Sequence, residues 1–432
     1  MPRTRKSRVP TDDELRRITT RAVAEIVPHQ EFVDGLRSGK TMRLKMGFDP
    51  TVPVITLGWA VGLRKLRQLQ DLGHTVVIII GDWTARIGDP SGASQTRRML
   101  PTREVRANAN EILEKFYKIL KRELTEVRWQ REWFDKFPLT KLARLASHVT
   151  VSQMLERDDF EERYKSGRPI HLQEFIYPLL QAYDSVAVEA DVEFGGTDQK
   201  FNILLGRALQ PKYNQPPQCA FLVPLLVGYR GGGKKMSQSL DNYIAIDEQP
   251  HEMYSKLMKI PDTLIMDYFE LLTDIPDKEL ADIRESIEKR SENPKDHKMR
   301  LAREIVTQFH TMDVALEAED EWDRRFPKGE LTEGIQEYHI SFSKTAEKFQ
   351  RTVFDVEGIR RVDSLSLPKV LFEVGLASSI SDARRLIKQR AVDINGDVHT
   401  SEDFALIDGL TFRVGKYRFL RIVDADKHSP SS

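Results

Sequence analysis

The sequence has almost no cysteine and no long hydrophobic run. Cys219 is the single cysteine among 432 residues, so no disulfide bond forms within the chain. This thiol lies in an apolar run, and we therefore expect it to be buried and chemically inert. No run approaches the roughly 18 apolar residues of a membrane-spanning helix. The basic residues 1–10 are not followed by an apolar stretch, so we expect no signal peptide and a cytoplasmic protein.

The sequence also lacks an excess of charge of either sign. It has 66 basic and 66 acidic residues, and the formal net charge is zero. Any nucleic-acid binding must therefore come from local basic faces rather than from a field of the whole protein. With 40% hydrophobic and 31% charged residues, the composition is that of a folded globular protein. The length exceeds what one core supports and indicates two or three domains.

Strand-like and helix-like patterns alternate in the first half of the chain. Residues 75–81 are apolar on both faces, which is typical of a central parallel strand. The other expected elements are helices at 11–40, 63–72 and 199–209 and strands at 42–48, 188–194 and 220–227. This alternation indicates a parallel α/β sheet. Ligands bind at the carboxyl ends of such strands, where 49–50, 81–82 and 195–196 form loops.

The second half of the chain has a different pattern. Residues 253–326 are predicted to be helical, with breaks at Pro261, Pro276 and Pro294. Residues 346–362 carry no strong pattern and are interpreted as a linker. Residues 363–425 indicate a small α+β unit with a helix at 381–389 and strands at 392–394 and 411–414.

Five short strings occur in a fixed order along the chain. They are 47–51 (GFDPT), 88–92 (GDPSG), 181–184 (QAYD), 195–199 (GGTDQ) and 235–239 (KMSQS). Each string alone is weak, but the ordered set with its spacing is very specific. The chain resembles bacterial tyrosyl-tRNA synthetases, which are class I enzymes with a C-terminal S4 domain, from about residue 12 to its end.

This resemblance implies three domains and a set of partners. It implies a Rossmann-like parallel-sheet catalytic domain at 1–240 with a dimer-interface insertion around 120–165. It also implies an all-α, anticodon-side domain at 241–345 and, after the linker 346–362, an α+β S4 RNA-binding domain at 363–432. The implied partners are tyrosine, ATP with accompanying Mg²⁺, tRNA(Tyr) and a second copy of the chain. No protein metal site and no membrane contact are expected.

The tyrosine-binding residues follow from the same resemblance. The family reads the phenol hydroxyl with the aspartate that here is Asp184, and a phenylalanine would leave that buried carboxylate unpaired. Tyr177, Gln181 and Asp184 fall on one helix face at spacings i, i+4 and i+7. The alternative is an ordinary amphipathic helix whose row of polar side chains is hydrogen-bonded within the protein. The resemblance assigns the ammonium to Tyr177, Gln181 and Asp89. The remaining substrate-binding residues are Gln199, near the carboxylate, Asp49 and Thr84.

Many family members carry a tyrosine two positions before the glycine of the GFDPT string. This chain has Lys45 at that position. Some bacterial branches also lack the tyrosine, so the difference does not weigh heavily against the resemblance.

The ATP-binding strings depart from the family pattern at three places. Thr56 and Trp59 replace both histidines of a His-x-Gly-His string around Gly58. Ala93 and Gln95 stand where basic residues are usual, and Gln238 replaces the second lysine of the KMSKS string. The resemblance leaves Lys235, Thr56 and Arg97 as catalytic candidates. The ATP-binding candidates are Gly47, Gly58, Gly196, Asp198, Lys234, Lys235 and Ser237. Loss of one donor to a transition state typically costs about 2.7–4 kcal/mol.

These departures leave several interpretations open. The chain is a working tyrosine–tRNA ligase that relies on its remaining cations, or an impaired relative that binds tyrosine or RNA without efficient activation. A deliberately altered chain and transfer of the activated amino acid to another acceptor are further alternatives.

The C-terminal region carries a basic cluster on one short helix. Arg384, Arg385, Lys388 and Arg390 concentrate positive charge there and match the S4 pattern. Phosphate backbones bind such faces through counterion release, so we expect RNA binding. For the helical segment before it, a plain bundle with solvated charges remains the alternative to an anticodon-side domain.

Overall fold

The structure is a computed structural model, and it divides into two compact units. The units are Met1–Trp322 and Asp323–Ser432. The structure describes residues 7–88, 101–289, 291–325, 336–342, 350–354, 360–395, 397–404, 409–415 and 418–426. No helix among these residues is long and apolar enough to cross a membrane.

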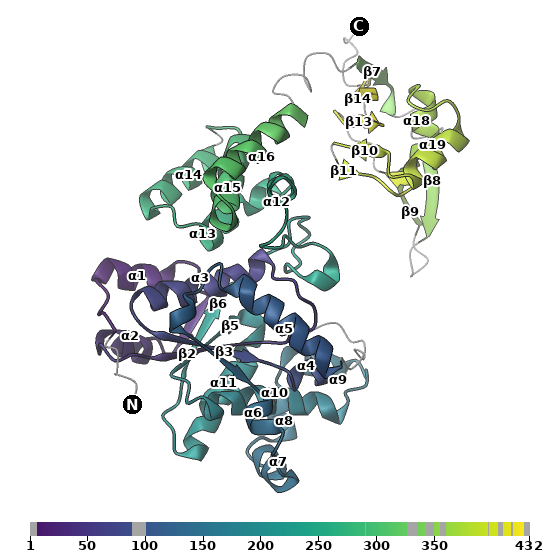
Figure 1. Cartoon of the computed structure of the whole chain (residues 1–432). Coiled ribbons are helices and arrows are strands. Elements are labelled where there is room, and N and C mark those ends of the chain that lie inside the picture. Colours follow the sequence, from purple (N-terminus) through teal and green to yellow (C-terminus); the bar gives the residue numbers. More distant parts are fainter. Residues whose placement is uncertain are drawn as a thin grey trace. The chain divides into compact units, whose positions relative to one another are not determined.

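A six-stranded sheet forms the centre of the first unit (Figure 1). Its strands are β1 (Glu25–Val27), β2 (Arg43–Phe48), β3 (Thr75–Ile80), β4 (Thr125–Trp129), β5 (Val192–Gly196) and β6 (Cys219–Val223). The spatial order is β1-β6-β5-β2-β3-β4. Strands β2 to β6 pair in parallel, as the sequence predicts, and β1 pairs antiparallel with β6 at one edge.

The sheet is buried on both faces because helices cover each of them. Figure 1 shows α3 and α5 on one side and α10 and α11 on the other. These helices are α3 (Leu57–Asp71), α5 (Thr102–Phe116), α10 (Leu172–Ala187) and α11 (Lys200–Leu209). Alternate residues of β3 belong to different cores: Ile78 packs in the cluster with Leu66 of α3, whereas Ile79 packs with Val188. This two-sided burial explains why residues 75–80 read as a continuous apolar run.

The predicted helix at 11–40 is wrong in its middle. The structure has α1 (Asp12–Thr20), strand β1 and α2 (His29–Arg37) in this range. Ile26 pairs with Phe221 of β6, which lies almost two hundred residues further along the chain. Because that partner is remote in sequence, the local periodicity does not reveal the strand.

Helices and one strand connect the two halves of the sheet. Strand β4 is followed by α6 (Arg131–Phe134), α7 (Leu139–Ala146), α8 (Val151–Met154) and α9 (Asp158–Lys165) before α10 begins. The short helix α4 (Thr84–Ile87) follows β3. The four most exposed large apolar side chains of the described residues lie in or beside this insertion. They are Leu139, Val151, Tyr164 and Leu172.

The last part of the first unit is helical, as the sequence predicts. Its helices are α12 (Pro250–Met258), α13 (Ile265–Leu272), α14 (Asp277–Lys289), α15 (Pro294–Phe309) and α16 (Met312–Arg325). Their buried apolar residues, such as Tyr268 and Ile305, belong to the same hydrophobic cluster as Leu66 of α3 and Phe48 of β2. The helical part and the sheet therefore share one core.

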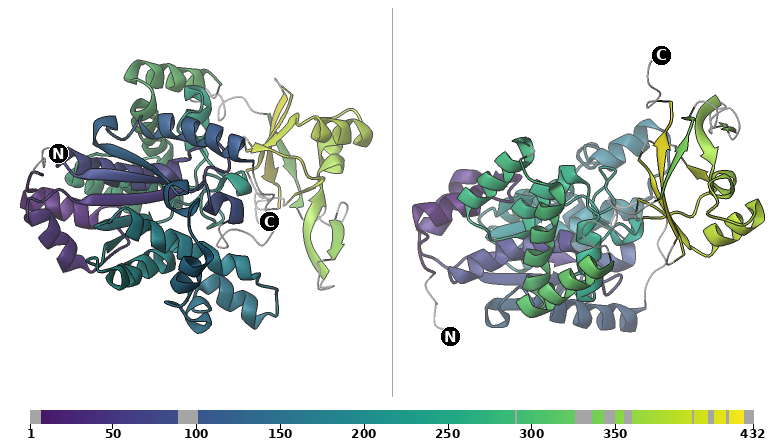
Figure 2. Two further views of the ribbon diagram at one scale, coloured as in Figure 1. Left: turned by 60° about the horizontal axis from the view of Figure 1, so that its bottom comes forward. Right: turned by 90° about the horizontal axis from the view of Figure 1, so that it is seen from above.

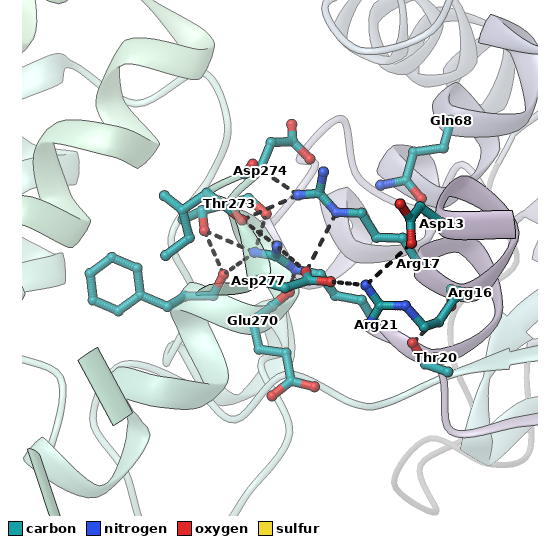
Figure 3. Close-up of polar contacts among 12 residues, drawn as sticks. Asp13, Arg16, Arg17, Thr20, Arg21, Gln68, Glu270, Thr273, Asp274 and Asp277 are labelled. Atoms are coloured by element: carbon teal, nitrogen blue, oxygen red, sulfur yellow. Dashed lines mark hydrogen bonds and ion pairs between the residues drawn. The ribbon is translucent and has the colours of Figure 1, made fainter. Parts of the chain in front are cut away.

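Arginines in and directly after α1 bind the carboxyl end of α13 (Figure 3). The guanidinium of Arg21 is buried, and it donates to the backbone carbonyls of Thr273 at 2.8 Å and of Glu270 at 3.3 Å. Arg17 donates to the carbonyl of Asp274 at 2.9 Å. The last carbonyls of a helix have no partner within the helix and carry a partial negative charge, so cations stabilise this end.

In the described residues of the second unit, two small sheets lie beside the helices α18 and α19. Its elements are β7 (Gln336–Ile340), β8 (Gln350–Phe354), β9 (Arg360–Ser366), α18 (Leu367–Glu373), α19 (Ile380–Lys388), β10 (Val392–Ile394), β11 (Asp397–Val398), β12 (Asp403–Phe404), β13 (Thr411–Val414) and β14 (Arg418–Asp424). The strand orders are β11-β10-β13-β14-β7 and β12-β9-β8. The turned views in Figure 2 show α18 and α19 on one side of the larger sheet.

The structure differs from the sequence interpretation at the start of this unit. Strand β7 falls in the range 241–345 that was interpreted as helical, and it pairs in parallel with β14. Strands β8 and β9 pair with each other, although 346–362 was interpreted as a linker. For β7, the partner that makes the strand lies about eighty residues away, so the local pattern gives no signal.

Candidate active site

A cavity of about 520 Å³ lies at the carboxyl ends of the parallel strands. It occupies the edge of the sheet at which the sequence predicts ligand binding. The predicted residues that line it are Gly47, Asp49, Thr56, Gly58, Thr84, Tyr177, Gln181, Asp184, Gly196, Asp198, Gln199, Lys235 and Ser237. Lys234 is not among its lining residues. Asp89 and Arg97, together with Ala93 and Gln95, lie outside the described residues.

Asp184 is the buried carboxylate of this cavity. It lies on α10 and is 2% exposed. Its Oδ2 accepts a hydrogen bond from Gln130 Nε2 at 2.8 Å, and its Oδ1 accepts one from Trp133 Nε1 at 3.1 Å. Burial raises the pKa of Asp184 to about 7, and the nearby Lys45 cation and the Gln130 hydrogen bond counteract this only in part.

A polar network runs from Asp184 to the other side of the cavity. Gln130 Oε1 accepts from the backbone N–H groups of Trp83 and Thr84, which fixes the amide so that its Nε2 faces Asp184. The Thr84 hydroxyl lies 2.6 Å from Asp49 Oδ1, and Tyr177 donates its hydroxyl to Asp49 Oδ2 at 3.0 Å. The side chains at the ends of β2 and β4 and on α4 and α10 are therefore held by one another.

Gly81 makes room for this network. A β-carbon at this position would lie 2.1 Å from Asp49 Oδ1 and 2.3 Å from Thr84 Oγ1. No side chain fits at such distances without displacing both groups. Glycine is thus required here by close approach rather than by backbone conformation.

The amide side chains on the opposite wall also bind one another. Asn202 Nδ2 donates to Gln181 Oε1 at 2.9 Å and to Gln199 Oε1 at 3.1 Å. Asn202 is buried. It orients both glutamines, because each presents its carbonyl oxygen to Asn202.

Sequence reasoning missed Gln130, Trp133 and Asn202. Gln130 directly follows β4 at the carboxyl edge of the sheet, so the rule that located the other loops also covers it once β4 is known. Residues 125–129 have no continuous apolar run, and all five are only partly buried. No comparable signal in the sequence indicates Trp133 or Asn202.

The amino end of α3 forms the wall nearest the strand edge. Thr56 precedes the helix and makes no side-chain capping bond. The N–H of Leu57 donates to the carbonyl of Ile244 at 2.8 Å, and that of Trp59 donates to the carbonyl of Thr56 at 3.0 Å. The partial positive charge at the amino end of a helix favours phosphate. Trp59 packs its ring against Phe48 at 6.5 Å and Phe116 at 6.2 Å between centroids. This position therefore contributes an apolar wall.

The segment that contains Lys235 closes another side of the cavity. Lys235 Nζ lies 2.6 Å from Asp198 Oδ2, so the cation is held by a carboxylate at the end of β5. Gln238 donates its amide to the carbonyl of Val54, just before α3. The backbone N–H of Ser237 donates to Asn242 Oδ1 at 2.8 Å.

A second cavity, of about 460 Å³, lies between α1, α3 and α15. It contains several arginines, but carboxylates pair with them. Arg8 lies 2.6 Å from Glu14, and Arg64 lies 2.7 Å from Asp274. None of the described strands ends there, so the first cavity is the candidate active site.

The basic residues predicted to bind RNA lie on and just after α19 in the second unit. All four side chains are exposed. Arg384 pairs with Glu402 at 3.3 Å, and Arg385 pairs with Asp382 at 2.7 Å. Local carboxylates thus offset part of the positive charge of Arg384 and Arg385. Lys388 and Arg390 add further positive charge to the same face.

Comparison with known proteins places the chain in a family. The family model "tRNA synthetases class I (W and Y)" matches residues 37–327, and the S4 domain model matches residues 365–406. This chain belongs to the class I tRNA synthetases of the tryptophan and tyrosine group. The family and the domain are those that the five ordered strings and the basic C-terminal helix indicate.

Curated relatives in this family match almost the whole chain. A tyrosine–tRNA ligase of Dehalococcoides mccartyi strain CBDB1 is 48% identical over 413 residues, covering 96% of this chain and 99% of that protein. The tyrosine–tRNA ligase of Moorella thermoacetica is 47% identical, covering 94% and 95% of the two chains.

Solved structures of this family share the fold. A tyrosyl-tRNA synthetase of Archaeoglobus fulgidus, complexed with L-tyrosine, superposes with a TM-score of 0.58 at 22% identity, covering 71% of this chain and 99% of that chain. A C-terminally truncated mitochondrial enzyme of Aspergillus nidulans gives a TM-score of 0.59 at 21% identity, covering 74% and 94%. The parallel α/β sheet predicted from alternating strands and helices, and the Rossmann-like catalytic fold implied by the resemblance, are thereby confirmed.

Proposed function

We propose that this chain is a tyrosine–tRNA ligase. In the first step, a carboxylate oxygen of tyrosine attacks the α-phosphorus of ATP, and pyrophosphate leaves, which gives tyrosyl-adenylate. In the second step, a hydroxyl of the terminal ribose of tRNA(Tyr) attacks the activated carbonyl, and AMP leaves. The observation that carries this proposal is the carboxylate of Asp184, which is buried beside the cavity and accepts hydrogen bonds from the side chains of Gln130 and Trp133.

In this proposal Asp184 selects the amino acid. The phenol hydroxyl of tyrosine donates a hydrogen bond to the carboxylate, whereas phenylalanine leaves a buried charge without that donor. Tyr177 and Gln181, on the same face of α10, hold the ammonium together with Asp89, and Gln199 lies near the carboxylate. Asp49 and Thr84 keep this set in place, because Asp49 accepts hydrogen bonds from Tyr177 and Thr84.

The phosphates of ATP lie between the amino end of α3 and the segment at Lys235. Lys235 and the positive amino end of α3, near Thr56 and Gly58, stabilise the charge that develops on the phosphate oxygens, and Arg97 and Lys234 add to them. The glycines Gly47, Gly58 and Gly196, with Asp198 and Ser237, surround the nucleotide. Among the described residues no group of acidic, histidine or cysteine side chains is arranged to hold a metal ion. In this proposal Mg²⁺ accompanies ATP.

The proposal includes a homodimer and an RNA-binding second unit. The exposed apolar side chains of Leu139, Val151, Tyr164 and Leu172 lie in or beside the predicted dimer insertion around 120–165, and in this proposal a partner subunit covers them. The basic residues on and after α19 bind the tRNA backbone. The chain acts in the cytoplasm, which agrees with its single buried thiol, whose pKa burial raises to about 11.

Tyrosine-dependent exchange between pyrophosphate and ATP tests the first step. We expect exchange with tyrosine and at least about a hundredfold less with phenylalanine, because the missing hydroxyl leaves Asp184 unpaired. If the protein binds tRNA(Tyr) but shows no exchange with any amino acid, it is a binding protein with a synthetase fold.

The packing of Trp59 favours a specific second candidate, an enzyme of reduced activation rate. An aromatic wall against Phe48 and Phe116 replaces a donor to phosphate. The double variant Thr56→His/Trp59→His separates the two candidates. A rise in exchange of about 10²-fold or more identifies an impaired site, and an unchanged or lower rate shows that the native groups suffice. Trp129→His is the control, since it changes an aromatic residue outside the cavity lining.

A further inference from the structure

A buried ion pair lies directly behind the amino-acid side of the cavity. Lys45 on β2 is fully buried, and its Nζ lies 2.9 Å from Oε1 of Glu193, its neighbour across the sheet on β5. The same Nζ donates to the carbonyl of Gln181 at 2.9 Å and to the hydroxyl of Ser185 at 2.8 Å. The three N–H groups of the ammonium therefore all have partners.

The carboxylate of Glu193 is equally enclosed. Its Oε2 accepts from Ser185 Oγ at 2.9 Å and from Gln218 Nε2 at 2.6 Å, and its Oε1 accepts from Gln181 Nε2 at 3.1 Å. Burying such a pair costs several kcal/mol in desolvation per ion, and apolar residues of similar size often serve stability as well or better. Stability alone therefore gives no reason for these charges in the centre of a sheet.

The pair acts on Asp184 because of where its contacts lie. Gln181 and Ser185, which the ammonium binds, precede and follow Asp184 on α10. The ammonium of Lys45 thus interacts electrostatically with two buried carboxylates, those of Glu193 and Asp184. Lys45 lowers the pKa of Asp184 and Glu193 raises it, while burial is the largest influence and raises it. The two members of the ion pair consequently oppose each other at this site.

The groups around Asp184 come from α10 and from the elements that pack against it. Gln130 and Trp133 donate to it, and α4 contributes Thr84 to the network. The helices α4, α7 and α11 and the short helix η3 (Gln210–Tyr213) also pack against α10. Their ionisable side chains are Arg86 over the ring of Trp83, Lys141 over the ring of Tyr183, Lys200 with Glu25 and Arg207 with Glu31, together with Arg144, Lys212 and Tyr213. Asp49 is bound to Tyr177 and Thr84.

We propose that Lys45 and Glu193 form a charge pair that sets the protonation of Asp184, and thereby the pH range in which the enzyme selects tyrosine. Both are positioning residues, because they act through Asp184 rather than on the substrate. The ionised carboxylate accepts the phenol hydroxyl with both oxygens available as acceptors. The protonated acid presents its own O–H instead and binds tyrosine more weakly. The inference rests on the proposed function of Asp184.

The test is the dissociation constant of tyrosine as a function of pH. In the wild-type enzyme, a group that titrates near pH 7 makes binding about tenfold weaker at pH 6 than at pH 8. Lys45→Met moves the midpoint of this change upward, and Glu193→Gln moves it downward. A displacement of one pH unit makes binding at pH 7 about fivefold weaker in the first variant and about twofold tighter in the second. The titration of tyrosine itself is common to all variants and cancels in the comparison.

The matched control is Lys65→Met, which removes a buried lysine of α3 that is bonded to the carbonyls of Arg17 and Ile18, away from the cavity. We expect its midpoint to equal that of the wild type. Midpoints displaced in opposite directions by Lys45→Met and Glu193→Gln support the charge pair. If the pair were purely structural, loss of either member would weaken tyrosine binding in the same way. Displacements in the same direction, or none, overturn it.

A single variant suffices if Lys45→Met does not fold. A downward midpoint in Glu193→Gln then supports the inference, and an upward or unchanged midpoint refutes it. Failure of the proposed function has a different signature, because the wild-type enzyme then binds no tyrosine at any pH.

Discussion

Asp184→Asn removes the charge of the buried carboxylate and keeps nearly its size. We expect this change to alter stability in a way that depends on pH. Burial raises the pKa of Asp184 to about 7 in the folded protein, against 3.8 for an exposed aspartate. The folded state therefore binds this proton more tightly than the unfolded state. The stability contributed by this group is fully present below pH 3.8 and is lost as the pH rises toward 7.

The magnitude follows from the size of the pKa difference. Each pH unit between the two pKa values costs about 1.4 kcal/mol of unfolding free energy, which amounts to about 4 kcal/mol in total. The asparagine variant has no such loss. The stability of the variant relative to the wild type should therefore rise by about 3 kcal/mol between pH 5 and pH 8, with little change above pH 8.

A second effect is independent of pH. The asparagine amide presents an NH₂ group where either Gln130 or Trp133 donates, and one of these donors loses its acceptor. This loss costs about 1–3 kcal/mol at every pH. The absolute stability of the variant thus depends on both effects, whereas the slope of the difference with pH depends on the buried charge alone.

Urea denaturation followed by tryptophan fluorescence measures this slope. All five tryptophans lie between residues 59 and 322, so the signal reports the first unit. Asp13→Asn, at a side chain that is 96% exposed, is the control and should show no slope. If the difference in unfolding free energy between Asp184→Asn and the wild type is constant from pH 5 to pH 8, the buried charge is refuted. Exchange assays on the same variant should show that discrimination between tyrosine and phenylalanine is largely lost.

Two further predictions concern the support of the site and the attachment of the helical part. Gly81→Ala should raise the KM for tyrosine at least tenfold in the exchange assay, because a β-carbon displaces the carboxylate and hydroxyl beside it; an unchanged KM would show that these groups are dispensable. Arg21→Met should lower the unfolding free energy of the first unit by about 2–4 kcal/mol, because it leaves buried helix carbonyls without donors. Arg16→Met, at a side chain that is 61% exposed, should cost less than about 1 kcal/mol, and equal losses would contradict the capping role.

The sequence predicts those parts of the fold whose signal is local. Residues 75–80 are apolar throughout because the strand is buried on both faces, and this pattern is visible without any partner. Strands β1 and β7 have no such local pattern, since each is short and pairs at a sheet edge with a strand far away in sequence. These strands form only in the assembled sheet, so no short stretch of the sequence predicts them.

The residues of the site also divide into those with a local sequence signal and those that only the fold brings together. Tyr177, Gln181 and Asp184 are predicted together because helical spacing places them on one face. Gln130 and Asn202 orient these residues from other elements, and only the fold brings them near. The ion pair of Lys45 with Glu193 depends even more on the fold, because each is a charged residue that interrupts its apolar neighbours in a strand. Two such interruptions become a pair only once the register of β2 and β5 is known.

The hydrophobic cluster that joins the sheet to the helical part has a consequence for how this enzyme can be divided. The boundary at 240/241, drawn where strands give way to helices, crosses that cluster rather than separating two cores. A polypeptide ended there would lose Tyr268 and Ile305 from the cluster that contains Leu66, which would expose apolar side chains, and the guanidinium of Arg21 would lose its helix end. The catalytic sheet is therefore not an independent folding module, and trimming the chain to it should yield aggregation instead of a minimal activating enzyme.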